Sequence, residues 1–176
     1  IIPVAISYEY DPNDYLKATE FLLKRLDPAF KKSPHDDLLS METGLLQPKG
    51  RVHFQIGRGI NDFLTKLPAD TDKAEILKSV CSAIDCEIHS NYKIFPINYI
   101  AHDLLHHNQE YHAEYTEDEL HSFQNYIEQQ LDKVRLDSVS VMDRDYMREM
   151  MLTMYFNPLK NKIAASGKRC GTVIPD

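Results

Sequence analysis

Two stretches, IIPVAI (residues 1–6) and GRVHFQIGRGIN (residues 50–61), decide which fold this chain can form. The first is continuously apolar, as in a strand that is covered on both faces. The second alternates Val52, Phe54 and Ile56 with polar residues, which is the period of a strand. Because residues 7–49 carry mostly helical signals, we expect two parallel strands joined by a crossover connection.

Helical signals dominate the rest of the chain. The expected helix starts are Asp11–Pro12, Ser33–Pro34, Asp72, Pro96, the capping box Thr116–Glu119, and Asp143. Asn157–Pro158 should stop the last long helix or restart a short one that ends at Gly167. The predicted fold class is mixed α/β: a remnant of a parallel-type sheet with crossover helices in residues 1–62, followed by a mostly helical region in residues 63–176.

Only two strands are visible in the sequence, and two strands do not form an independently stable sheet. We therefore expect that further strands come from elsewhere, that Ile1 is not the natural start, and that this is the C-terminal part of a larger α/β protein. An unpaired strand edge also predicts a dimer formed through that edge.

Composition narrows the function classes. The net charge of −7 argues against a general nucleic-acid binder. No apolar run approaches the roughly 18 residues of a membrane span. Cys81, Cys86 and Cys170 lack metal-type spacing and are interpreted as reduced thiols. These features predict a cytoplasmic protein.

The two opening stretches resemble two sequence blocks of the glycerolipid acyltransferase family, of the lysophosphatidic acid acyltransferase type. Residues 1–6 are similar to its apolar-apolar-Pro-Val-apolar strand. Residues 50–60 are similar to its Gly-x-Val-x-Val-x-x-Gly-x-Pro-Ile strand, with Gly59 where proline is usual. The likeness covers residues 1 to about 61.

The resemblance implies a parent enzyme that moves a fatty acyl group from acyl-CoA or acyl carrier protein to a lysophospholipid or glycerol-phosphate hydroxyl. It implies no metal and no cofactor. The family's catalytic Asn-His-x-x-x-x-Asp block is absent, since no histidine here has aspartate five positions on, so no catalytic residue is assigned and the fragment alone should be inactive. Ile2, Pro3 and Val4 match a family motif, which implies that they shape the substrate pocket.

Two other interpretations stay open. One is a helical regulatory or interaction module without catalysis. The other is a metal-dependent hydrolase built on His102, Asp103 and His106, because two histidines one helical turn apart can share a metal ion. The commoner explanation of these histidines is a polar helix end.

Two further patterns concern surfaces. Met147, Met150, Met151 and Met154 recur at helical spacing, which indicates helix–helix core more often than a ligand-binding face. The tail carries Lys160, Lys162, Lys168 and Arg169 without an acidic residue between them. Such a tail predicts peripheral contact with the inner face of a membrane.

Overall fold

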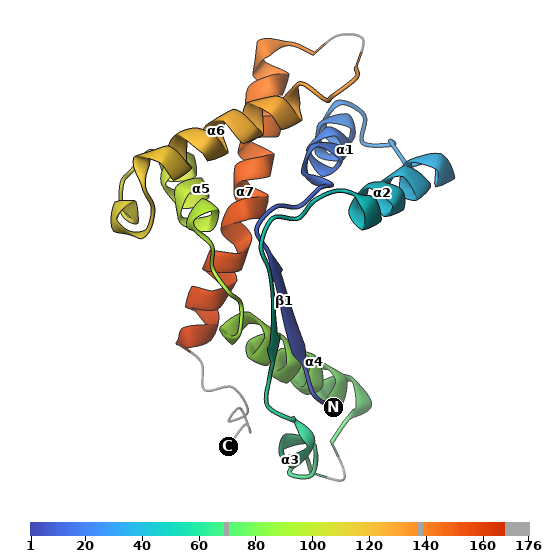
Figure 1. Cartoon of the computed structure of the whole chain (residues 1–176). Coiled ribbons are helices and arrows are strands. Elements are labelled where there is room, and N and C mark those ends of the chain that lie inside the picture. The colour runs from blue at the N-terminus through green and yellow to red at the C-terminus, as the bar shows by residue number, and fades with distance from the viewer. Residues whose placement is uncertain (69–70, 137–138, 168–176) are drawn as a thin grey trace. The chain divides into compact units, whose positions relative to one another are not determined.

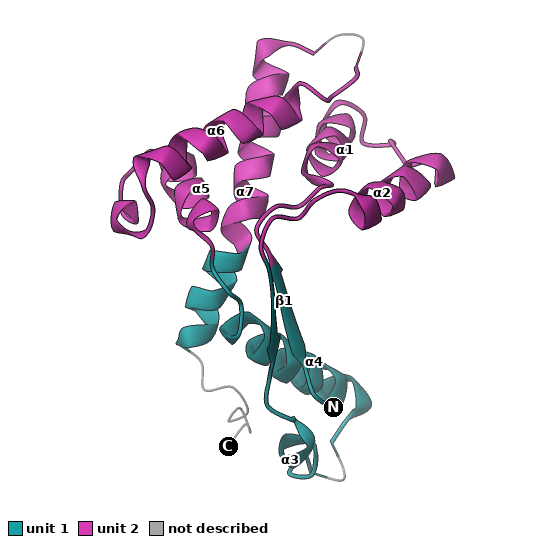
Figure 2. Ribbon diagram, in the orientation of Figure 1, with its two compact units in different colours: residues 1–7, 52–94, 158–176 teal, residues 8–51, 95–157 magenta. Residues whose placement is uncertain are grey.

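The computed structural model describes residues 1–68, 71–136 and 139–167. The chain forms two compact units whose segments interleave in sequence (Figure 2). Unit 1 contains residues 1–7, residues 52–94 and the chain from residue 158 on, and unit 2 contains residues 8–51 and 95–157. Mixed α/β architecture is confirmed. The predicted division at residue 62 stays a prediction.

Unit 1, teal in Figure 2, holds the sheet, whose first strand is labelled β1 in Figure 1. Its strands are β1 (Val4–Tyr8, of which Tyr8 belongs to unit 2) and β2 (Val52–Ile56). Its helices are α3 (Asn61–Leu64), α4 (Lys73–Ser90) and the end of α7 (Val141–Ser166).

The two strands pair antiparallel, so the prediction of a parallel pair with a crossover is wrong for them. The amide of Gly57 donates to the carbonyl of Pro3 at 2.9 Å, and that of Glu9 donates to Arg51 at 2.9 Å. The connection consists of two successive helices, α1 (Asp14–Leu26) and α2 (Pro34–Leu46), after which the chain returns beside β1. The sequence pattern reveals these helices but not the direction in which the chain comes back.

One face of the sheet is covered within unit 1. Ala5 and Ser7 are buried, and the Ser7 hydroxyl accepts a hydrogen bond from the Lys93 amide at 3.0 Å. Gly57 lets α4 approach closely, since a Cβ there would lie 2.7 Å from Cγ of Glu87. The Glu87 carboxylate in turn accepts from the Arg58 amide at 2.7 Å.

Unit 2 is a helical bundle. It contains α1 (Asp14–Leu26), α2 (Pro34–Leu46), α5 (Pro96–His106), the short 3₁₀ helix η1 (His112–Glu114), α6 (Glu117–Leu131) and the first part of α7. Its core joins four helices through apolar side chains: Ala18, Leu22, Ile100, Phe123, Ile127, Leu131, Met147 and Met151. The interpretation of the methionine stripe as helix–helix core is confirmed.

Local end signals were predicted well. Ser33 with Asp36, and Thr116 with Glu119, form reciprocal capping boxes. Pro96 stands in the first turn of α5 as expected. Pro158, however, lies inside α7, which continues to Ser166. In the turn before this proline, Asn98 Nδ2 donates to the Tyr155 carbonyl at 2.8 Å, which connects α5 to the backbone of α7.

Burial was predicted less well. Leu26 and Leu77 continue the apolar spacing of their helices, which predicts burial, but they are 62% and 64% exposed. Cys81 is exposed and free, whereas Cys86 is disulfide-bonded. The interpretation of the cysteines as reduced thiols is therefore wrong for Cys86, and the cytoplasmic assignment loses that support.

Candidate functional site

The two strands that carry the sequence blocks place their apolar residues on one face. The residue numbers of opposite residues sum to 60, as the bonds Gly57–Pro3 and Glu9–Arg51 define. Val4 therefore lies opposite Ile56, and Ile6 opposite Phe54. These four side chains are 44–70% exposed. The described part of the chain thus leaves one entirely apolar sheet face uncovered.

The predicted substrate-binding residues divide between the two faces. Pro3 is buried and its carbonyl accepts from Gly57. Ile2 and Val4 are 64% and 44% exposed. Since side chains alternate along a strand, Ile2 and Val4 share the open face while Pro3 shapes the backbone beneath it.

The histidine cluster in unit 2 is compact. His102 and His106 stack with ring centroids 4.3 Å apart, and Phe156 lies edge-on to both. His102 Nδ1 lies 2.8 Å from Asp103 Oδ1, and His106 Nδ1 lies 2.8 Å from the His102 carbonyl. His102 Nε2 is 3.8 Å from the exposed carboxylate of Glu110.

Asp103 ties the segment after α5 to the helix. Its buried carboxylate accepts hydrogen bonds from the Tyr111 amide at 3.0 Å and from the Tyr115 hydroxyl at 2.9 Å. Burial and the Asp103 charge raise the pKa of Tyr115 to about 12. The phenol therefore stays protonated at neutral pH and keeps donating, so this network has an evident structural role.

The cluster does not have the arrangement of a metal centre. Over the residues described, no group of three or more His, Cys, Asp or Glu side chains is placed to hold a metal ion. The geometry therefore does not favour the hypothesis of a metal-dependent hydrolase at His102 and His106.

A second polar network, which the sequence analysis missed, lies in the core of unit 2. Asp14 is fully buried, and its Oδ2 accepts from the hydroxyls of Tyr126 and Tyr155, each at 2.7 Å. Burial raises the pKa of Asp14, although both hydroxyls oppose that shift. In the sequence Asp14 has only the signature of an acidic residue in a first helical turn.

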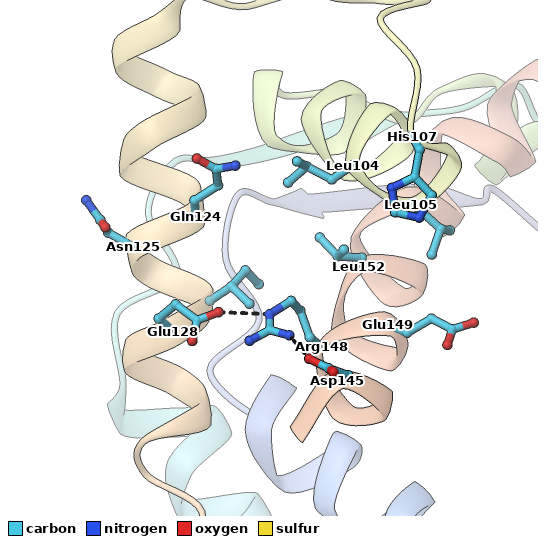
Figure 3. A pocket seen from close by; sticks show the side chains of 11 residues that line it. Leu104, Leu105, His107, Gln124, Asn125, Glu128, Asp145, Arg148, Glu149 and Leu152 are labelled. Atoms are coloured by element: carbon cyan, nitrogen blue, oxygen red, sulfur yellow. Dashed lines mark hydrogen bonds and ion pairs between the residues drawn. The ribbon is translucent and has the colours of Figure 1, made fainter. Parts of the chain in front are cut away.

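A groove of about 770 Å³ runs between α5, α6 and α7 of unit 2 (Figure 3). Its apolar lining is Leu104, Leu105, Ile127 and Leu152. The volume lies within the range of small-molecule sites.

The polar lining of the groove contains more acidic than basic side chains. Glu128, Asp145 and Glu149 contribute carboxylates, and Arg148 contributes a single guanidinium. Arg148 bonds Glu128 at 2.8 Å and also contacts Asp145. The hydrogen bond from Arg148 lowers the pKa of Glu128, which is therefore ionised at neutral pH. No sequence motif predicts this groove, because its residues come from three separate helices.

The basic tail is described only in part. Lys162 Nζ donates to the Tyr92 carbonyl at 2.6 Å, so this lysine makes a contact within unit 1. Lys168 and Arg169 lie outside the described residues. Among the described helices, none combines the length and the apolar character needed to cross a membrane.

Comparison of the chain with protein-family models, with curated proteins and with solved structures gave no match in any of the three.

Proposed function

We propose that this chain is the C-terminal portion of a glycerolipid acyltransferase of the lysophosphatidic acid type. The parent enzyme would form an ester between an acceptor hydroxyl oxygen and the acyl carbonyl carbon. The carbon–sulfur bond of the thioester would break, and CoA or acyl carrier protein would leave as the thiol.

One observation carries the proposal. The two blocks on which the resemblance rests are neighbouring strands, and together they expose an apolar face that includes Ile6, Phe54 and Ile56. An uncovered face of this kind is typical of an interaction surface or of a layer that other parts of a domain cover. In the proposed enzyme, the catalytic histidine and aspartate lie in the parts that cover it.

The remaining elements take subordinate roles in this proposal. Ile2 and Val4 would contact the acyl part of the substrate from the open face, and Pro3 would fix the strand beneath them. The 176-residue chain alone would be inactive. The basic residues near its end would add peripheral membrane contact, which salt should weaken in a liposome co-sedimentation assay.

The deciding experiment is acyl transfer by the protein that the complete reading frame encodes, next to the 176-residue chain. Labelled acyl-CoA and acyl carrier protein serve as donors, and lysophosphatidate and glycerol phosphate as acceptors. We expect transfer by the complete protein and none by the chain. In the complete protein, Val4→Asp should abolish transfer, whereas Glu42→Gln on exposed α2 should leave it unchanged.

Three results would overturn the proposal: a reading frame that starts directly at Ile1, no transfer by the complete protein, or transfer by the 176-residue chain itself. The first two would leave a helical interaction module as the better description.

A further inference from the structure

The groove between α5, α6 and α7 combines an aliphatic floor with an electronegative rim. Leu104, Leu105 and Leu152 supply the floor from two helices, and α6 adds Ile127. In Figure 3, Gln124 and Glu149 lie on opposite sides of Leu152. A ligand that fills the groove therefore meets hydrocarbon along its middle and polar groups at both ends.

The charge balance of the rim favours a cation. Arg148 is the one guanidinium in the lining, and it already contacts two carboxylates, Glu128 and Asp145. The Glu149 carboxylate is exposed and, within the part of the chain that the structure describes, makes no ion pair or hydrogen bond. This leaves an available negative charge at the rim.

The end of α5 adds to the negative potential. Leu104 and Leu105 line the groove from the last turn of the 11-residue helix α5, and the C-cap residue His107 lines it directly after that turn. The last carbonyl groups of a helix carry a partial negative charge. A cationic head placed between this helix end and Glu149 would be stabilised by both, whereas a carboxylate there would be repelled.

We propose that this groove binds a small cationic amphiphile, with an aliphatic chain on the leucine floor and a primary ammonium group near Glu149. The site lies within unit 2 and does not involve the sheet of unit 1, so this proposal is independent of acyl transfer. A free alkylamine is the simplest molecule with this chemistry, and the groove volume suits a single chain of that kind.

The test is an NMR titration of the whole 176-residue chain with three eight-carbon probes below their micelle concentrations: octylammonium, octanol and octanoate. We expect octylammonium to bind at least about tenfold more tightly than octanoate, which corresponds to about 1.4 kcal/mol. The resonances that shift should be those of groove residues such as Leu104, Leu105 and Leu152. The affinity for octanol should lie between the affinities for octylammonium and octanoate.

Matched variants separate the two parts of the site. Glu149→Gln should weaken octylammonium binding by about two- to fivefold, the effect of one exposed ion pair, and leave octanol binding unchanged. Glu42→Gln, also an exposed helix glutamate, should change neither. Leu105→Gln should weaken the binding of all three probes, and circular dichroism checks that this variant is folded.

Equal affinity for octylammonium and octanoate would overturn the proposal, as would no binding, or shifts confined to residues outside the groove. Because the assay measures binding alone, a failed acyl-transfer experiment would leave this result intact, and the reverse also holds.

Discussion

At the scale of single residues, Asp14 is unusual because it is an acidic side chain in the core of unit 2. Its carboxyl is fully buried and, among the described residues, is bonded by two tyrosine hydroxyls and the Tyr15 amide and not by a cation. Burial without a positive partner disfavours the charged form, so the pKa of Asp14 is raised above its ordinary 3.8.

This raised pKa predicts a pH dependence. The contribution of Asp14 to the free energy of unfolding is fully present below about pH 3.8 and is lost as the pH rises through the folded-state pKa. Asp14→Asn cannot ionise, so its stability relative to the parent protein should improve as the pH rises from about 4 to the folded-state pKa of Asp14, and should stay constant above that pKa. Urea unfolding at a series of pH values measures this difference.

The control is Asp118→Asn, which changes an exposed aspartate. Its stability relative to the parent should vary much less over the same range. A constant difference between Asp14→Asn and the parent at every pH would show that Asp14 does not titrate as its burial predicts.

Gly57 supports a second prediction at this scale. An added Cβ would lie 2.7 Å from Glu87 Cγ and 3.1 Å from the Pro3 carbonyl oxygen. Gly57→Ala should therefore lower the free energy of unfolding by about 1–3 kcal/mol, as overpacking usually does. Gly59→Ala is the matched control, because its nearest neighbour would be the Ile1 carbonyl at 3.8 Å.

Thermal and urea unfolding followed by circular dichroism compare these two glycine variants. Adding Glu87→Ala to Gly57→Ala should restore part of the loss, since it removes the closest of the crowded atoms. Equal stability of the Gly57 and Gly59 variants would mean that α4 does not approach the sheet as closely as the structure has it.

At the scale of elements, the sequence predicts local structure better than partners. The alternation in residues 52–56 identified β2, and Thr116 with Glu119 identified the start of α6. The direction of β2 depends on how the helices between the strands fold back, which no local pattern encodes. Likewise Leu77 looks like a core residue of α4, yet its burial depends on whether another element covers that face.

The open sheet face gives a prediction about β2. Phe54 is 64% exposed, so Phe54→Lys should change the free energy of unfolding of the 176-residue chain by less than about 1 kcal/mol. It should also make the chain more soluble, because it interrupts the apolar face. Urea unfolding and the concentration at which the protein precipitates measure the two effects.

Ala5→Lys is the control on the covered face, where Ala5 is 2% exposed. This change should unfold unit 1 or destabilise it strongly, since it buries an unpaired charge. If Phe54→Lys were as damaging as Ala5→Lys, the face of Phe54 would be covered in solution.

At the scale of the whole molecule, the sites show the limit of sequence reasoning. The continuous apolar run of residues 1–6 predicts a strand that is covered on both faces, and this is wrong for the face of Ile2 and Val4, which are exposed. The one-turn spacing of His102 and His106 correctly brings their rings together. The groove and the Asp14 network could not be predicted, because each is assembled from helices far apart in the chain. Their residues have ordinary neighbours in sequence, and only tertiary packing gives them a common environment.

The sheet predicts how molecules of the 176-residue chain associate. Among the residues that the structure describes, the sheet has two strands, and each has one outer edge without a neighbouring strand. In the register that the Gly57–Pro3 bond defines, the N–H and C=O groups of odd-numbered residues of β1 point toward β2. Those of even-numbered residues therefore point toward the outer edge. Because this free edge borders an apolar face, we expect two chains to pair through it.

Sedimentation velocity should show a dimer whose fraction rises with protein concentration. Ile6→Pro should reduce that fraction while the circular dichroism spectrum is retained, since it removes an outward N–H and leaves the pairing with β2 intact. Ser7→Pro is the matched control: its N–H points into the ladder, so this change should instead disrupt the sheet. A parent chain that stays monomeric at every concentration, or an Ile6→Pro variant that dimerises like the parent, would contradict association through the β1 edge.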